Sequence, residues 1–204
     1  MSPERWLDLM KGFGVGEHRE MFRRLRDAYS ERHRHYHTVA HIDACLREFD
    51  PFRSLARFAR EVEAALWFHD VIYAPRASDN ESRSADLAVQ FLASAGVLSD
   101  ACARVHSHIL ATMHNAEPAY PDSALVVDVD RSILGQDPVA FDAFETQVRE
   151  EYKWVPGPLF RRKRVEVLRS LLERKCIYST PQFRERYEAP ARVNLKRAID
   201  RLEK

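Results

Sequence analysis

His69 and Asp70 lie inside an otherwise apolar segment of the chain, residues 64–73. A segment that is apolar on every side is buried. Burying an ionisable pair costs free energy unless a nearby group compensates its charge, and a bound divalent cation does so. The pair is therefore a candidate for the centre of a metal site.

Further ligand types flank this pair in the sequence. His37 and His41 are four residues apart, which places them on one face of a predicted helix. Asp128 and Asp130 follow the apolar residues 124–127, and we expect only one of them to be a direct ligand. A histidine, a His-Asp pair and a later aspartate predict a metal site assembled from three helices.

Neutral imidazole and carboxylate ligands favour Mn, Fe, Co, Ni or Zn, whereas Mg is less favoured because the set contains two nitrogens. Two carboxylates neutralise a divalent cation. Two imidazoles and two carboxylates also leave coordination positions for water and substrate, which is typical of a catalytic rather than a structural site.

Composition predicts one domain of 204 residues, because 45% hydrophobic residues are enough for one substantial core. The net charge of +1 predicts neither a membrane partner nor specific nucleic-acid binding. Three cysteines without a C-x-x-C pair predict small core residues in a reducing compartment. No segment reaches the roughly 20 apolar residues of a membrane helix. We therefore expect a cytoplasmic protein and leave a homo-oligomer open.

The pattern of residues predicts an all-α fold. Only 6 glycines are present, and no segment alternates apolar and polar residues as strands do. Ser78 with Glu81 predicts a capping box, and Asp137-Pro138 and Thr180-Pro181 predict helix starts. We expect about eight to nine helices, near residues 17–33, 38–48, 55–72, 79–95, 99–113, 122–134, 138–153, 158–175 and 189–203.

His41, His69-Asp70 and Asp130 resemble the ordered His…His-Asp…Asp signature of the HD-domain superfamily, which are metal-dependent phosphohydrolases of compact all-helical fold. Segments 34–41, 67–73 and 79–85 resemble a bacterial subfamily of HD-type phosphohydrolases whose substrate is unknown. The resemblance covers most of the chain. It implies one helical domain, 1–204, with a metal-site core at about 30–135 and C-terminal helices 138–204 packed on it.

The resemblance also implies roles for single residues. His41, His69, Asp70 and Asp130 are the implied metal ligands. Asp130 is preferred to Asp128 because the last ligand in many HD proteins directly precedes an arginine. The segment 36–41 is similar to that of cyclic-nucleotide phosphodiesterases, which makes His37 the implied proton donor.

The expected reaction is hydrolysis of a phosphate ester of a nucleotide or another small phosphorylated metabolite. Asp70 is expected to accept the proton of the attacking water, and His37 to protonate the leaving oxygen. Arg34 and Arg131 are candidates to bind phosphate, since a guanidinium donates two parallel hydrogen bonds to an anion. Surface salt bridges are the alternative for both arginines.

Several alternatives stay open. Glu81 either closes the capping box or orients a water or a ligand, and Asp128 has a similar supporting role. His106, His108 and His114 are candidates for a second metal position, as in HD-type di-iron oxygenases, and His114 is also a catalytic candidate. A polar helix end is the other interpretation of these histidines. A non-catalytic metabolite-binding module that holds a metal is the third functional class.

Overall fold

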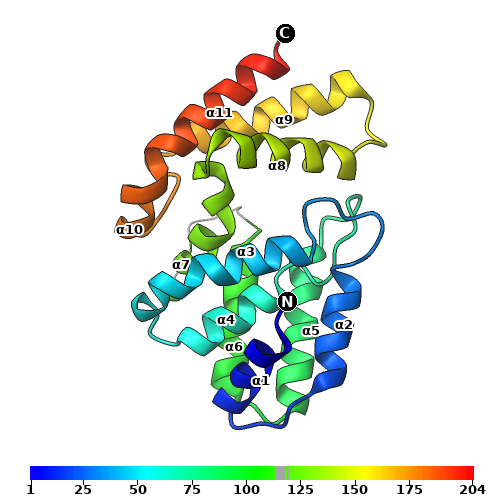
Figure 1. The fold of residues 1–204 in the computed structure, drawn as a ribbon, viewed down its shortest axis with the longest axis vertical. Coiled ribbons are helices and arrows are strands. Elements are labelled where there is room, and N and C mark those ends of the chain that lie inside the picture. Colours follow the sequence, from blue (N-terminus) through cyan, green and yellow to red (C-terminus); the bar gives the residue numbers. More distant parts are fainter. Residues whose placement is uncertain (114–117, 119) are drawn as a thin grey trace. The chain divides into compact units, whose positions relative to one another are not determined.

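The structure, a computed structural model, describes residues 1–113, 118 and 120–204. It divides the chain into two compact units, Met1–Asp130 and Arg131–Lys204. The described residues form helices and short helical turns but no strand, so the prediction of an all-α fold is confirmed (Figure 1). A single domain over 1–204 remains a prediction.

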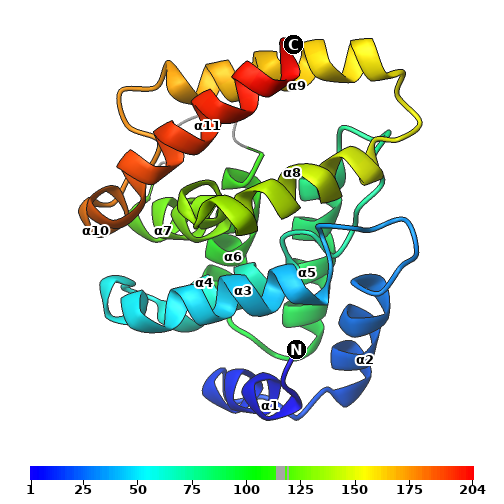
Figure 2. The ribbon, with the colours of Figure 1, turned by 45° about the horizontal axis from the view of Figure 1, so that its top comes forward.

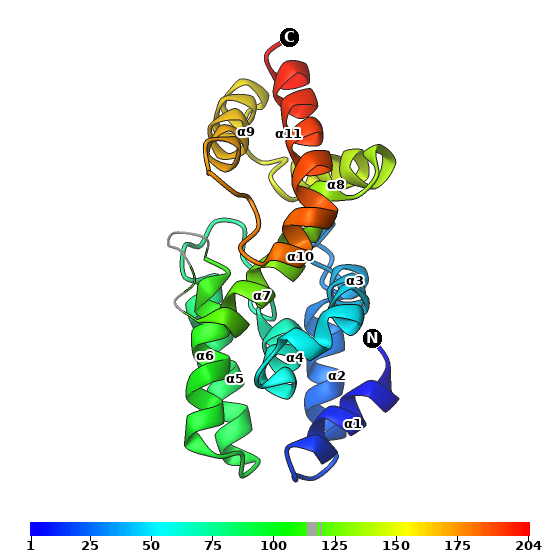
Figure 3. The ribbon, with the colours of Figure 1, turned by 90° about the vertical axis from the view of Figure 1, so that its left-hand side faces the viewer.

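The first unit contains the predicted metal site. Figure 3 shows α4 in the middle of this unit, and α4 packs against α1, α3, α5, α6 and α7. Its helices are α1 (Pro3–Gly12), α2 (Arg19–Ala28), α3 (Val39–Phe49), the 3₁₀ helix η1 (Asp50–Leu55), α4 (Ala59–Phe68), α5 (Asn80–Ser94), α6 (Ser99–Ala111) and α7 (Pro121–Asp130).

Helix α4 is buried on all sides from Glu61 to Phe68, as its apolar sequence predicts. The buried carboxylate of Glu61 is paired with both Nε and Nη2 of Arg104, at 2.5 and 2.8 Å. A buried carboxylate is tolerated only when it is paired in this way. Helix α4 ends at Phe68, directly before His69. Because its neighbours pack around it, α4 fixes the position of His69 and Asp70.

The second unit is also helical. Its elements are the 3₁₀ helix η2 (Arg131–Gly135), α8 (Pro138–Glu151), α9 (Gly157–Leu172), α10 (Pro181–Phe183), the π-helical turn η3 (Arg184–Glu188) and α11 (Ala189–Leu202). Helix α11 packs against α9 and η2, and Figure 2 shows it crossing α9. The buried Asn194 of α11 donates to the carbonyls of Leu134 and Gln136, at 3.0 and 2.9 Å. These bonds fix η2, which directly follows Asp130.

Two helices are shorter in the structure than their local sequence pattern predicts. The helix predicted at 55–72 begins at Ala59, where the carboxylate of Asp122 accepts from the amides of Arg57 and Phe58. The helix predicted at 122–134 ends at Asp130 and continues only as η2.

Helix α1 and the three-residue α10 lie outside the predicted helix ranges. Ser2 caps α1 by accepting from the amide of Arg5, and Pro3 occupies the first turn. The prediction that Thr180-Pro181 starts a helix is confirmed, although Thr180 makes no side-chain cap hydrogen bond. The Asp137 cap is also confirmed, since its carboxylate accepts from Val139 and Ala140.

The predicted capping box of Ser78 and Glu81 is wrong. Asp79 is the N-cap of α5, and the cap makes no side-chain hydrogen bond. The side chains of Asn80 and Ser84 instead bond to the loop that follows Asp70. Among the helices that the structure describes, none is long and apolar enough to cross a membrane.

Candidate metal centre

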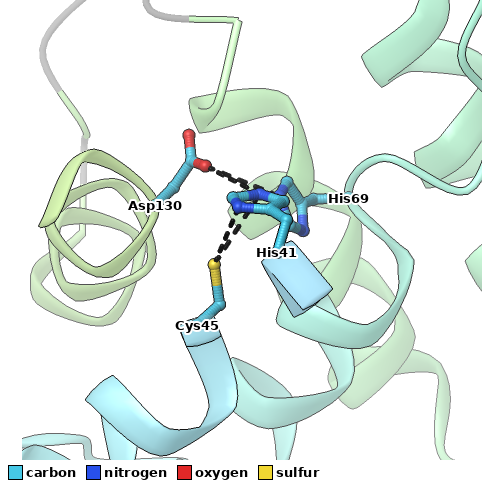
Figure 4. Close-up of side chains that lie close together, drawn as sticks. All are labelled: His41, Cys45, His69 and Asp130. Carbon is cyan, nitrogen blue, oxygen red and sulfur yellow. Dashed lines mark hydrogen bonds and ion pairs between the residues drawn. The ribbon is translucent and has the colours of Figure 1, made fainter. Parts of the chain in front are cut away.

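Side chains from three elements of the first unit converge at one point. Figure 4 shows His41 from α3, His69 from the end of α4 and Asp130 from the end of α7 pointing toward one another. The Nε2 atoms of His41 and His69 are 3.2 Å apart. Oδ1 of Asp130 lies 3.3 Å from Nε2 of His41 and 3.6 Å from Nε2 of His69.

Asp70 joins the same cluster. Its Oδ2 lies 3.0 Å from Nε2 of His69 and 3.4 Å from Nε2 of His41. Two ligand atoms that are each about 2.1 Å from one ion lie about 3.0 Å apart at a right angle and about 3.4 Å apart at the tetrahedral angle. The observed separations of 3.0 to 3.6 Å therefore fit the donor set of one transition-metal ion.

The ring of His69 is oriented by its own helix. His69 is the C-cap residue of α4, and its Nδ1 lies 3.1 Å from the carbonyl oxygen of Leu66. Because a carbonyl only accepts, Nδ1 carries the hydrogen, and the lone pair of a neutral ring is then on Nε2. A backbone carbonyl is a usual hydrogen-bond partner for the second ring nitrogen of a metal-binding histidine. Here this hydrogen bond points Nε2 of His69 toward the cluster.

Cys45 is a member of the cluster that the sequence did not predict as a ligand. It lies one helical turn after His41 on α3, and its Sγ is 3.7 Å from both ring nitrogens of His41. One donor atom each from His41, Cys45, His69 and Asp130 lie within 4.8 Å of one another. The spacing of four residues between His41 and Cys45 was the signal in the sequence.

The charges of the cluster favour a cation. Burial alone would lower the pKa of His69, but Asp70 and Asp130 raise it well above its ordinary value. Burial also opposes protonation of His41, whose pKa Cys45 and the two carboxylates raise well above the usual range. Conversely, burial would raise the pKa of Asp70, but the neighbouring histidines hold it well below its ordinary value. A divalent cation satisfies the same demand for positive charge.

Arg34 fixes the backbone of the His-Asp loop. Its buried guanidinium donates to the carbonyls of Asp70 (2.6 Å), Val71 (2.9 Å) and His37 (3.2 Å), and its Nε donates to Glu31. These bonds commit most of its donors, so the prediction of Arg34 as a phosphate ligand is replaced by a positioning role. It joins the loop before α3 to the loop after α4.

The start of α5 holds the other side of the same loop. The side-chain amide of Asn80 accepts from the amide of Ala74 and donates to its carbonyl, both at 3.0 Å. Ser84 Oγ accepts from the amide of Ile72 at 3.0 Å. Glu81 lies between them on α5 and is half-buried, and its role in orienting a water or a ligand remains a prediction.

His37 does not share a helix with His41, contrary to the sequence prediction. Helix α3 begins at Val39, and the backbone of Thr38 is extended. The ring of His37 instead stacks on Tyr73 with centroids 4.2 Å apart, and its centroid is 5.9 Å from that of His41. The loop thus keeps the half-buried His37 beside the cluster.

The two predicted alternatives for the last ligand are placed differently. Asp130 contributes its oxygen to the cluster, whereas Asp128 is fully buried two residues earlier on α7. Arg131 begins the second unit, where its Nη1 donates to the carbonyl of Ile177 at 3.4 Å. Its binding to phosphate remains a prediction.

The histidines proposed for a second metal have other contacts where they are described. His106 pairs with Asp86 of α5 at 3.4 Å, and Nδ1 of His108 lies 2.8 Å from Oγ of Ser123. In the described part of the chain, neither belongs to a group of three or more close ligand atoms. His114 lies outside the described residues.

Replacing Arg34 tests whether its hydrogen bonds hold the loop that contains His69 and Asp70 in place. We expect Arg34→Lys to lower the free energy of unfolding by about 2–4 kcal/mol, because lysine cannot reach several carbonyls at once and each unsatisfied buried group costs about 1–3 kcal/mol. Metal affinity should fall roughly 10- to 100-fold, as for other outer partners. Denaturant unfolding and metal titration measure both effects.

The control for this variant is Arg83→Lys on α5, where the side chain is exposed. It should change the free energy of unfolding by less than about 0.5 kcal/mol. A loss of stability in Arg34→Lys with unchanged metal affinity would contradict the positioning role.

We expect His108 to make the stability of the fold depend on pH. Burial lowers the pKa of His108 to about 4, whereas in the unfolded chain it is about 6.5. As the pH falls from 6.5 to 4, the unfolded state binds the proton first, so stability decreases over this range by up to about 3 kcal/mol. His108→Asn should remove this loss of stability at low pH. The measurement is the free energy of unfolding of both proteins at each pH. Equal pH slopes for both proteins would contradict it.

Comparisons with known proteins identify no relative of this chain. A scan against protein-family models, a search of curated proteins and a search of solved structures each gave no significant match.

Proposed function

We propose that this protein is a metal-dependent phosphohydrolase of the HD type that acts on a nucleotide or another small phosphorylated metabolite. The observation that carries this proposal is the convergence of His41, His69, Asp70 and Asp130 at separations suited to one ion. These residues follow the order His…His-Asp…Asp in the chain, as in the HD signature.

A divalent cation held by these residues would supply a Lewis acid that polarises a phosphoryl oxygen and activates a water molecule. The low pKa of Asp70 keeps its carboxylate ionised and able to hydrogen-bond that water. Because Asp70 is anchored through its own carbonyl by Arg34, its side chain stays beside the two ring nitrogens.

The proposed reaction is a displacement at phosphorus. The water oxygen forms a bond to phosphorus while Asp70 accepts its proton, and the bond from phosphorus to the ester oxygen breaks. His37 gives its proton to that leaving oxygen, so the products are an alcohol and a phosphate. His37 suits this role because it lies beside the cluster and is half-buried, and because an imidazole can donate a proton.

The donor set also supports the metals that we propose. Nitrogen and carboxylate ligands bind Mn, Fe, Co, Ni or Zn in preference to Mg. A nucleotide or another small phosphorylated metabolite as the partner, with a homo-oligomer left open, and a cytoplasmic location are parts of the same proposal.

A substrate screen tests the proposal. The full chain is freed of metal with a chelator, reloaded with one metal at a time and incubated with nucleotides and sugar phosphates, and released phosphate is measured. We expect release with at least one transition metal, little release with Mg, and none from metal-free protein or from His69→Ala.

The other functional classes give different results in this experiment. Consumption of dioxygen with two irons per chain, and no phosphate release, would identify an oxygenase. Tight binding of a metabolite without turnover would identify a non-catalytic binding module. Either result would contradict the proposed hydrolase.

A further inference from the structure

Cys45 belongs to the cluster of potential metal ligands among the described residues, but neither the HD signature nor the proposed reaction uses it. Its side chain is buried, with 2% of the residue exposed, on the same face of α3 as His41. Figure 4 shows the thiol below the ring of His41, with Asp130 and His69 beside the same ring. The described contacts of Sγ at 3.7 Å are with the ring nitrogens of a predicted ligand.

The distances suit direct coordination. A sulfur about 2.3 Å and a nitrogen about 2.1 Å from one ion lie about 3.6 Å apart at the tetrahedral angle. The observed separation of Cys45 Sγ from His41 Nε2 is 3.7 Å. The donor atoms of His69 and Asp130 also lie within 4.8 Å of the sulfur and of each other, so one ion can contact the whole set.

Cys102, another buried cysteine of the first unit, serves as a comparison. It is also buried, with 3% of the residue exposed, but its thiol donates to the backbone carbonyl of Val97 at 3.7 Å. This contact satisfies the weak thiol donor within the fold, and it involves no imidazole or carboxylate side chain. Cys45 differs because its neighbours are an imidazole and the other members of a donor cluster.

We infer that Cys45 is a thiolate ligand of the metal centre and makes it a site for zinc or iron rather than for manganese or magnesium. This inference rests on the metal site of the proposed function and narrows its choice of metal. Thiolate is a soft ligand that favours Zn and Fe, whereas Mn and Mg favour oxygen ligands. The set of His41, Cys45, His69 and Asp130 combines two nitrogens, a sulfur and an oxygen, which are the ligand types that zinc binds.

X-ray absorption at the zinc edge tests the inference on the zinc-loaded full chain. We expect a sulfur shell at about 2.3 Å in addition to nitrogen and oxygen at about 2.0–2.2 Å. Cys45→Ala should lose the sulfur shell, and Cys102→Ala, a matched substitution of a buried cysteine, should keep it. The wild-type spectrum alone tests the ligand, even if Cys45→Ala folds poorly.

Metal competition gives a second measurement. We expect Cys45→Ala to lower zinc affinity at least about tenfold and to change manganese affinity less than about threefold. Zinc bound by nitrogen and oxygen alone, with equal zinc affinity in Cys45→Ala, would overturn the thiolate ligand and leave the metal centre intact. Wild-type protein that binds none of Mn, Fe, Co, Ni and Zn would overturn both this inference and the proposed function.

Discussion

Asp130→Asn should remove most of the bound metal, whereas Asp128→Asn should leave it in place. Oδ1 of Asp130 lies 3.3 and 3.6 Å from the Nε2 atoms of His41 and His69. Asparagine keeps the shape of the side chain but loses the charge that helps to neutralise the cation. We expect the metal affinity to fall by more than about 100-fold, since loss of an outer partner alone costs 10- to 100-fold.

Asp128 makes the matched comparison because it lies on the same helix and is also an aspartate. Two residues correspond to about 200° around a helix, so the two side chains leave α7 on different faces. Asp128→Asn should therefore affect stability more than metal content, because Asp128 is fully buried. Elemental analysis and metal titration of both folded variants measure the difference. Equal metal affinity in the two variants would show that the last ligand is assigned wrongly.

The second large effect concerns the reaction rather than the metal. We expect His37→Ala to keep a near-normal metal content while phosphate release falls by roughly 10²- to 10⁴-fold, the usual loss for a positioned general acid. The ring of His37 stacks on Tyr73, and its centroid is 5.9 Å from that of His41, so it lies beside the cluster without being part of it.

The control is His106→Ala on α6. The side chain of His106 is about one third exposed and pairs with Asp86 at 3.4 Å, and among the described residues it belongs to no cluster of three or more ligand atoms. Turnover of this variant should stay within about threefold of wild type, as for surface substitutions away from a site. Loss of metal from His37→Ala would make His37 a ligand, and unchanged turnover would remove it from the reaction.

Local signals were sufficient to predict several helices of this fold. The predicted helices 38–48, 79–95 and 138–153 lie close to α3, α5 and α8, because their apolar spacing is encoded within each segment. The ends of α4 were not predictable in this way. They depend on contacts with Asp122, 64 residues or more away in the chain, and with Arg34.

The candidate site could be predicted in part, because some of its residues are recognisable from their local sequence alone. His41 and His69 were predicted because each is an ionisable residue beside an apolar segment, whereas Asp130 was preferred to Asp128 only through the resemblance to HD proteins. Cys45 was not predicted, since a thiol is compatible with an apolar core and its importance depends on which side chains it faces. The role of Arg34 was also hidden, because its partners are backbone carbonyls that only the folded loop brings together.

The most direct test of the metal centre is elemental analysis of the purified full chain beside His69→Ala. His69 is chosen because its Nε2 contacts His41, Asp70 and Asp130, and its orientation is fixed by the Leu66 carbonyl. We predict about one divalent transition-metal ion per chain in the wild-type protein and only a small fraction of that in the folded variant. A wild-type chain that binds no metal after reconstitution, or a His69→Ala variant with the full metal content, would contradict the account.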